Sequence, residues 1–258
     1  MIYPMSYSIN KLYSLLLLSA IVASTLLAES SNTTSLELNE QAVKAVQQKN
    51  FSHAEDLFKR ALQVDDHNLT AVFNLSGMYL TNNKVNDAIR LLSNYTSSRY
   101  QGDAGLFVRL GDAHFANKEI EKACSDYETA LKLAPNYVGL NFKLGTVYTL
   151  RNNFPAAEQA LLAAVAQQPN DIVTISNLAN LFLAEGKTES AISTAKRALQ
   201  IKPSKSVYAT LGNAYEIQKD FKNALIAYQR ASDLGDNSPE LHEKLTTLKR
   251  ITNNVHGE

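Results

Sequence analysis

The side chains that could ligate a metal ion or act as a nucleophile are few and scattered along the chain. Two histidines four residues apart on a helix, or closely spaced cysteines, would predict a metal site, and neither pattern occurs. The lone cysteine has no second thiol for an internal disulfide. The histidines and the single cysteine of the chain are His53, His67, His114, His242, His256 and Cys124. They predict no metal site and no catalytic centre.

One short motif could suggest nucleotide chemistry. Gly186-Lys187-Thr188 resembles the end of a phosphate-binding loop, but that motif needs a glycine at position 181, which is Leu181. We therefore interpret Gly186 as a turn between two helices. The sequence predicts no catalytic residue, no cofactor and no enzymatic activity.

The elements that must position any site are copies of one segment, Val138–Asp171. It contains a helical pattern with Leu144, Gly145 and Tyr148, a short polar turn, and a second helical pattern that stops at Pro169. Matching segments begin at residues 35, 69, 104, 138, 172 and 205, which gives spacings of 34, 35, 34, 34 and 33. A period of about 34 residues is typical of a helix-turn-helix repeat.

In this period and residue pattern the chain resembles the tetratricopeptide repeat (TPR) family over residues 35–238. The resemblance implies an all-α, right-handed superhelical solenoid of six repeats: 35–68, 69–103, 104–137, 138–171, 172–204 and 205–238. Leu241, Leu245, Leu248 and Ile251 then mark one face of a capping helix over 239–251, followed by a tail over 252–258. Tyr100 replaces the proline that ends other repeats, and we expect a loose joint over residues 98–102.

Small residues recur where two antiparallel helices must approach closely. We number positions from the first residue of each repeat. Position 8 holds Gly111, Gly145, Ala179 and Gly212; position 20 holds Ala54, Ala88, Ala123, Ala157, Ala191 and Ala224; position 27 holds Ala61, Ala130, Ala164, Ala198 and Ala231. Large residues at positions 11 and 24, such as Tyr148 and Tyr228, are predicted to fill the core rather than to form a cofactor site.

The N-terminal segment differs in kind from the repeats. Leu12–Ala28 carries no charge, Lys11 precedes it, and a polar linker over residues 29–34 follows. This order predicts a signal peptide over residues 1–28, cut after Ala28. The alternative is an uncleaved anchor, although 17 residues would span only about 25 Å as a helix.

A signal peptide predicts an exported protein, placed in the bacterial periplasm. The alternatives are attachment to the inner membrane through residues 1–28 and passage through a eukaryotic secretory pathway. Five Asn-x-Ser/Thr sequons matter only in the last case; they begin at Asn32, Asn50, Asn68, Asn74 and Asn94.

The TPR resemblance also implies a concave groove lined by positions 2, 5, 6, 9, 12 and 13 of the first helices. The residues predicted to bind a peptide there are Phe73, Asn74, Arg109, Asp112, Phe142, Lys143, Asn177, Asn180 and Asn213. Amides can pair with a peptide backbone and the two cations can meet carboxylates. An extended acidic segment across repeats three to six is the predicted ligand.

The predicted partner is therefore a protein or peptide. The chain has 25 Lys and Arg against 25 Asp and Glu, so its charge favours no nucleic acid, and a membrane contact is expected only if residues 1–28 stay uncut. The predicted function is an exported scaffold in envelope or secretion-complex assembly. Alternatives are a membrane-anchored assembly subunit and the recognition arm of a separately encoded enzyme.

Overall fold

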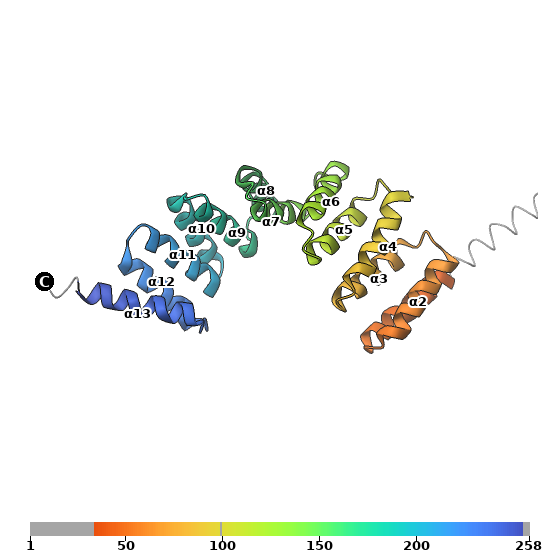
Figure 1. Cartoon of the computed structure of the whole chain (residues 1–258), viewed down its shortest axis with the longest axis horizontal. Coiled ribbons are helices and arrows are strands. Elements are labelled where there is room, and N and C mark those ends of the chain that lie inside the picture. Colours follow the sequence, from red (N-terminus) through yellow and green to blue (C-terminus); the bar gives the residue numbers. More distant parts are fainter. Residues whose placement is uncertain (1–33, 99, 255–258) are drawn as a thin grey trace, which may run out of the picture. The chain divides into compact units, whose positions relative to one another are not determined.

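The computed structural model describes residues 34–98 and 100–254 (Figure 1). No strand occurs in these ranges, and the predicted all-α helix-turn-helix fold is confirmed. Residues 34–47 are helical. The helices that follow are α2 (Phe51–Val64), α3 (Leu69–Thr81), α4 (Val85–Ser98), α5 (Ala104–Ala116), α6 (Ile120–Leu133), α7 (Leu140–Leu150), α8 (Phe154–Gln167), α9 (Ile172–Ala184), α10 (Thr188–Ile201), α11 (Lys205–Ile217), α12 (Phe221–Asp233) and α13 (Pro239–Asn254).

The chain divides into two compact units, and α5 contributes to both. The first unit comprises the described residues up to Gln101 together with Asp112–Asn117; the second comprises Gly102–Gly111 and the chain from Lys118 onward. The division at Gln101 and Gly102 falls in the segment where the sequence predicts a loose joint. Within the second unit each helix from α6 to α13 packs against the next one along the chain.

The turn inside each repeat has one conformation. Position 15 is left-handed in all six repeats, with φ of 60° at Lys49, 59° at Asn83, 62° at Lys118, 56° at Asn152, 74° at Gly186 and 61° at Lys219. In the repeat of Asn152, the Asn153 N–H donates to Tyr148 O and the Asn152 N–H donates to Thr149 O. These two bonds are a Schellman motif, which satisfies the last carbonyls of the first helix. Gly186 is thus a turn residue.

The first helix of repeat four begins two residues after the first residue of its repeat, Val138. This helix, α7, begins at Leu140, whereas α3, α5, α9 and α11 begin at the first residue of their repeats. The reason is Gly139, whose φ of 82° is left-handed and lies outside the helical region.

The glycines at position 8 mark the closest approach between the two helices of a repeat. A Cβ atom added to Gly111 would lie 2.5 Å from the Tyr127 ring, and one added to Gly212 would lie 2.5 Å from the Tyr228 ring. At Gly145 the obstacle is Leu161, at 2.6 Å. Each obstructing side chain stands at position 24 of the same repeat, so a small residue at position 8 is what lets position 24 be large. The alanines at position 20 are fully buried in all six repeats.

Polar side chains join consecutive repeats at several points, and we call four of these contacts the interrepeat clasps. In two of them a lysine at position 16 meets a glutamate at position 21 of the preceding repeat: Lys84 with Glu55 at 2.8 Å and Lys187 with Glu158 at 2.6 Å. In the other two, position 14 meets a glutamate at position 18: Arg151 with Glu121 at 2.8 Å and Gln218 with Glu189 at 3.0 Å. Adjacent repeats are therefore matched by side chains as well as by packing.

The last helix covers the end of repeat six. Leu241, Leu245 and Leu248 of α13 are buried against Ala224, Tyr228 and Ala231 of α12. Lys244 Nζ lies 2.7 Å from Glu216 Oε2 and 5.2 Å from the Tyr228 ring centroid. The helix continues past Ile251 to Asn254, and the Thr252 hydroxyl donates to Leu248 O within it.

The predicted signal peptide over residues 1–28 lies outside the described residues, as does most of the linker over 29–34. Of the helices that the structure describes, none has the length and apolar character needed to span a membrane.

Candidate protein-binding surfaces

The nine residues predicted to line a groove are divided between the two units. Phe73, Asn74 and Asp112 belong to the first unit; Arg109, Phe142, Lys143, Asn177, Asn180 and Asn213 belong to the second. All nine are half-buried except Asn180, which is exposed. The groove stays a prediction.

In the second unit, the first helices α7, α9 and α11 lie side by side, since α9 contacts both neighbours. Lys143 on α7 holds its ammonium group 5.9 Å from the centroid of the buried Tyr127 ring. Such a cation–π contact fixes the direction of a long side chain at small energetic cost. The cation is thus presented from a defined place on α7.

Two of the predicted amides are already used within the protein. The Thr210 hydroxyl lies 2.7 Å from Asn180 Oδ1, and the Tyr228 hydroxyl lies 2.6 Å from Asn213 Oδ1. The carbonyl oxygens of these amides therefore help join α9 to α11 and α11 to α12, while the NH₂ groups remain the natural donors toward a ligand. The side chain of Asn177 makes no hydrogen bond with any other described residue.

In the first unit the corresponding amide is also paired. Asn74 Nδ2 donates to Asn39 Oδ1 at 3.0 Å, which joins the first helices of repeats one and two. Asn39 is buried. This amide pair serves interrepeat packing, and it leaves Asn74 a smaller part in ligand binding than the sequence predicts.

Exposed apolar residues at the ends of the first helices were not among the predicted binding residues. Leu150 and Ile217, both at position 13, are 56% and 58% exposed, and Val173 at position 2 of repeat five is 56% exposed. Exposed large aliphatic side chains that recur on one surface are common at protein interfaces. We therefore add these three residues to the candidate binding residues Asn177 and Asn180. Position 13 was already among the groove positions, so its apolar residues could have been found from the sequence.

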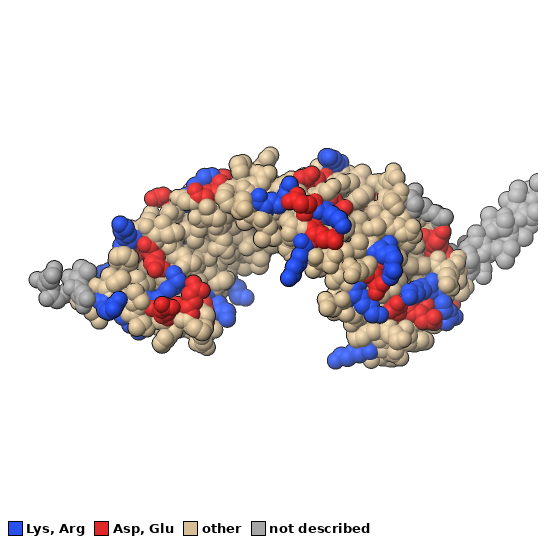
Figure 2. Space-filling model, viewed as in Figure 1, with Lys and Arg blue, Asp and Glu red and all other residues tan. Residues whose placement is uncertain are grey.

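Figure 2 shows acidic and basic side chains interspersed on the face in view, with no broad area of a single sign. This agrees with the balanced composition of 25 cationic and 25 anionic side chains. Binding through long-range attraction to a highly charged partner is therefore not favoured on this face.

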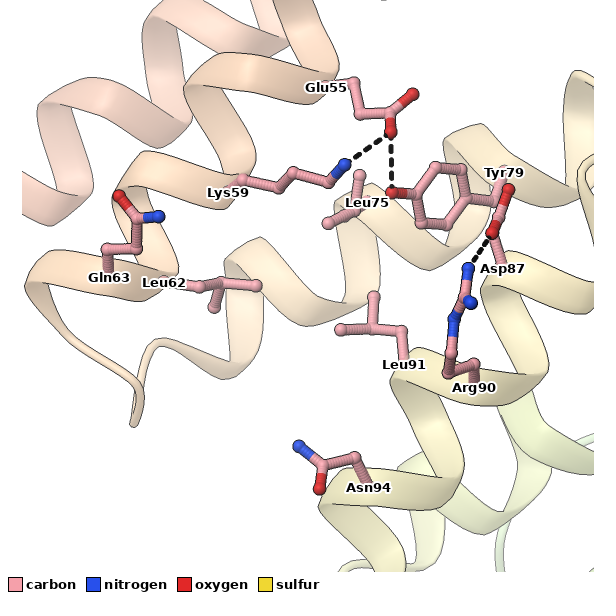
Figure 3. Close-up of a pocket in the computed structure, with 10 residues that line it drawn as sticks. All are labelled: Glu55, Lys59, Leu62, Gln63, Leu75, Tyr79, Asp87, Arg90, Leu91 and Asn94. Carbon is pink, nitrogen blue, oxygen red and sulfur yellow. Dashed lines mark hydrogen bonds and ion pairs between the residues drawn. The ribbon is translucent and has the colours of Figure 1, made fainter.

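A pocket of about 650 Å³ lies in the first unit, between the second helices α2 and α4 and above α3 (Figure 3). None of the nine predicted residues lines it. Leu62, Leu75 and Leu91 form its apolar part, and polar side chains surround them: Glu55, Lys59, Gln63, Tyr79, Asp87, Arg90 and Asn94. No sequence pattern indicated this pocket, because it needs three helices from two repeats.

Glu55 is the electrostatic centre of this pocket. Lys59 Nζ lies 2.7 Å from its Oε1, Lys84 Nζ lies 2.8 Å from its Oε2, and the Tyr79 hydroxyl donates to Oε1 at 3.1 Å. The hydrogen bonds from Lys59 and Lys84 lower the pKa of Glu55 to about 2, against the opposing effect of burial. Burial and the hydrogen bond to Glu55 raise the pKa of Tyr79, which keeps its hydroxyl a donor.

We expect Glu55→Gln to destabilise the first unit by about 1–2 kcal/mol at neutral pH, through loss of charge-assisted hydrogen bonds on a partly exposed carboxylate. Because the pKa is lower in the folded than in the unfolded chain, the stabilisation is complete above about pH 5 and is lost as pH falls towards about 2. Urea unfolding of both proteins across this range measures the difference. The exposed Glu37→Gln is the control; an equal effect of both substitutions would contradict the prediction.

Two of the reactive side chains, Cys124 and His114, are packed inside the protein. The Cys124 thiol is buried, with Arg151 Nη1 at 3.1 Å and Glu128 Oε1 at 3.4 Å from its sulfur. Burial raises the pKa of this thiol, which makes it a poor nucleophile. His114 is buried. Across residues 34–98 and 100–254 no three His, Cys, Asp or Glu side chains are grouped to hold a metal ion.

A tetratricopeptide repeat family model matches residues 108–172 and 176–239, and a second tetratricopeptide repeat model matches residues 45–104. The chain therefore belongs to the tetratricopeptide repeat family. Domains of this family are generally non-catalytic scaffolds that bind protein or peptide partners.

Two relatives illustrate how widely the repeat is used. The BBSome complex member BBS4 homolog of Drosophila melanogaster is 22% identical over 187 residues, which cover 72% of this chain and 38% of that protein. Human protein O-mannosyl-transferase TMTC1 is 27% identical over 212 residues, which cover 78% of this chain and 23% of that protein. The chain thus spans well under half the length of either relative.

Solved structures share the fold more completely. Pseudomonas aeruginosa PilF has a TM-score of 0.68 at 16% identity, covering 83% of this chain and 97% of PilF. YrrB, described as a TPR protein with an unusual peptide-binding site, has a TM-score of 0.63 at 18% identity, covering 75% of this chain and 97% of YrrB. MamA has a TM-score of 0.58 at 24% identity, covering 62% of this chain and 94% of MamA.

Proposed function

We propose that this protein is an exported, non-enzymatic scaffold that binds an extended acidic segment of a partner protein across residues 104–111 of α5 and across α7, α9 and α11. The observation that supports it most is the pair of exposed aliphatic side chains Leu150 on α7 and Ile217 on α11. These two helices contact α9, the helix of Asn177 and Asn180, from either side. Similarity of fold to YrrB, which has a peptide-binding site, is consistent with this proposal.

The proposed contacts contribute to binding in three ways: apolar burial, hydrogen bonding and attraction between charges. Leu150, Val173 and Ile217 supply apolar surface, and burying it drives association at about 25 cal/mol per Å². The amide NH₂ groups of Asn177 and Asn180 donate to the peptide carbonyls, which would otherwise lose their hydrogen bonds to water. Arg109 and Lys143, at the same position of successive repeats, attract carboxylates and set the preference for an acidic segment.

The test begins with affinity enrichment of partners from the native envelope, followed by calorimetry on the recovered partner. Arg109→Ala combined with Lys143→Ala is expected to weaken binding about tenfold at low salt and to reduce its salt dependence, because two partly exposed cations are lost. The unfolding midpoint should change little. Leu150→Ser with Ile217→Ser should weaken binding at all salt concentrations.

Lys132→Ala combined with Lys202→Ala is the matched control, since both lysines are exposed. Unchanged affinity in the Arg109 and Lys143 variant at low salt would reject this surface as the binding site. The polar pocket around Glu55 in the first unit would then become the leading alternative.

Export and a place in envelope or secretion-complex assembly are the second part of the proposal. They are supported by the uncharged run Leu12–Ala28 after Lys11. N-terminal sequencing of protein purified from its host is expected to begin at or near Glu29, with the protein released by gentle lysis of the outer compartment. Full-length protein that resists carbonate extraction would instead identify a membrane-anchored assembly subunit.

A further inference from the structure

A second surface lies at the C-terminal end of the second unit. A pocket of about 600 Å³ opens between the start of α12 and the end of α13, and we call it the C-terminal slot. Phe221, Leu225, Ile226 and Ile251 form its apolar lining. Its polar lining consists of Lys219, Asp220, Lys222, Thr252 and Asn253.

The slot includes positions of repeat six that, in earlier repeats, contact the next repeat along the chain. Leu225 and Lys222 stand at positions 21 and 18 of repeat six, which are the positions that the interrepeat clasps use in earlier repeats. Those positions hold the clasp glutamates Glu55, Glu121, Glu158 and Glu189. In repeat six the chemistry is changed, because an aliphatic residue and a lysine replace glutamate.

The charges at the slot are open to a ligand. Lys219 and Lys222 are exposed, and neither makes an ion pair with any residue that the structure describes. The Asp220 carboxylate accepts hydrogen bonds from Asn223 N at 3.2 Å and Asn223 Nδ2 at 2.7 Å as the cap of α12. It keeps its negative charge, so the slot is lined by two cations and one anion. Ile226 is 52% exposed beside them.

The helix α13 stands where the first helix of a seventh repeat would stand. Its leucines cover α12, but the place that a following second helix would fill is the slot. Five of the six second helices begin with an apolar residue at position 17, as Phe154 and Phe221 do, whereas α10 begins with Thr188. A helix that begins in the slot would therefore bring an apolar side chain to Leu225, Ile226 and Ile251.

We propose that the C-terminal slot binds a helical segment of a partner protein that carries an apolar side chain and flanking carboxylates in its first turn. The apolar lining favours the apolar side chain of the partner helix, and Lys219 and Lys222 favour its carboxylates. Acidic residues in the first turn of a helix are also stabilised by the helix dipole. The carboxylates that would bind the lysines would therefore stabilise the partner helix as well. The lysines make the slot a poor site for the basic residues, such as Lys84 and Arg151, that complete the internal clasps.

The experiment uses the full chain with ¹³C-labelled isoleucine methyl groups and a synthetic helical peptide as long as α10, 14 residues. The peptide carries phenylalanine and two glutamates in its first turn. We expect saturable shifts of the Ile226 and Ile251 methyls, with Ile175 in the core unaffected. Lys219→Glu with Lys222→Glu should weaken binding by at least about tenfold, as should serine in place of the peptide phenylalanine.

Lys202→Glu is the control for a change of net charge. The proposal is wrong if the acidic peptide causes no saturable shift, or if a peptide with lysines in place of glutamates binds equally well. Concentration-dependent shifts of Ile226 without peptide would identify a second copy of the chain as the occupant, and binding only to anionic lipid vesicles would identify a membrane. Either result would overturn the assignment, whereas loss of binding at α7, α9 and α11 would not affect it.

Discussion

Gly212→Ala is expected to destabilise the second unit by about 1–3 kcal/mol through overpacking, although alanine has the higher helix propensity by about 1 kcal/mol. The added Cβ would lie 2.5 Å from the Tyr228 ring. That ring has no easy way to move, because it is fully buried and its single hydroxyl proton is shared between Asn213 Oδ1 and Glu216 Oε2, both 2.6 Å from the hydroxyl oxygen. Urea unfolding monitored by circular dichroism measures the change.

A double substitution separates overpacking from other causes. Repeat five has alanine at both position 8 and position 24, in Ala179 and Ala195, and both are fully buried. Gly212→Ala in a Tyr228→Ala background should therefore cost little, so the two substitutions should be strongly non-additive. Gly102→Ala is the control, since nothing lies within 4 Å of the added atom. Equal losses from Gly212→Ala in both backgrounds would show that the assigned contact is not the cause.

Ending the chain after Asp236 is expected to have a larger effect. It removes α13, whose Leu241, Leu245 and Leu248 are buried, and loses roughly 5 kcal/mol or more of apolar burial. It also removes Lys244 from Glu216. Hydrogen bonds from Lys244 and Tyr228 lower the pKa of Glu216 although burial opposes ionisation, so the truncated chain keeps a partly buried carboxylate without its cation.

The exposed face of α12 should then cause dimerisation or aggregation, as terminal repeats of solenoids need a polar outer surface. Static light scattering measures the molecular mass. A chain that ends at Asn254 is the control and should behave like the full protein. If the chain that ends at Asp236 has the mass and thermal stability of the control, α13 is not a cap.

The repeat spacing was enough to predict the fold because it identifies contacts, not only helices. Gly145 could be placed at a helix crossing from the sequence, and the structure sets Leu161 against it. The left-handed turn residues could not be predicted at Lys118 and Lys219, since lysine has no preference for positive φ. The later start of α7 has a related cause: Gly139 is left-handed, so this helix begins two residues after the start of its repeat.

The candidate binding residues were harder to predict than the fold. Asn180 and Asn213 are on the expected helices, but their oxygens meet Thr210 and Tyr228 of neighbouring helices. A repeat pattern assigns a residue to a position, but it does not specify which side chain of a neighbouring helix that residue hydrogen-bonds. The pocket around Glu55 depends on three helices at once, so it follows from the packing of two repeats and from no single motif.

The interrepeat clasps have a consequence for how such a chain could be lengthened. Tandem duplication of repeat five would set Glu185, at position 14 of the new copy, against Glu189, at position 18 of the original. Two carboxylates would then face each other where Gln218 now donates to Glu189. Repeats of nearly identical backbone are thus not interchangeable modules: their side chains encode which neighbour each accepts, and the order of the array is part of its sequence information.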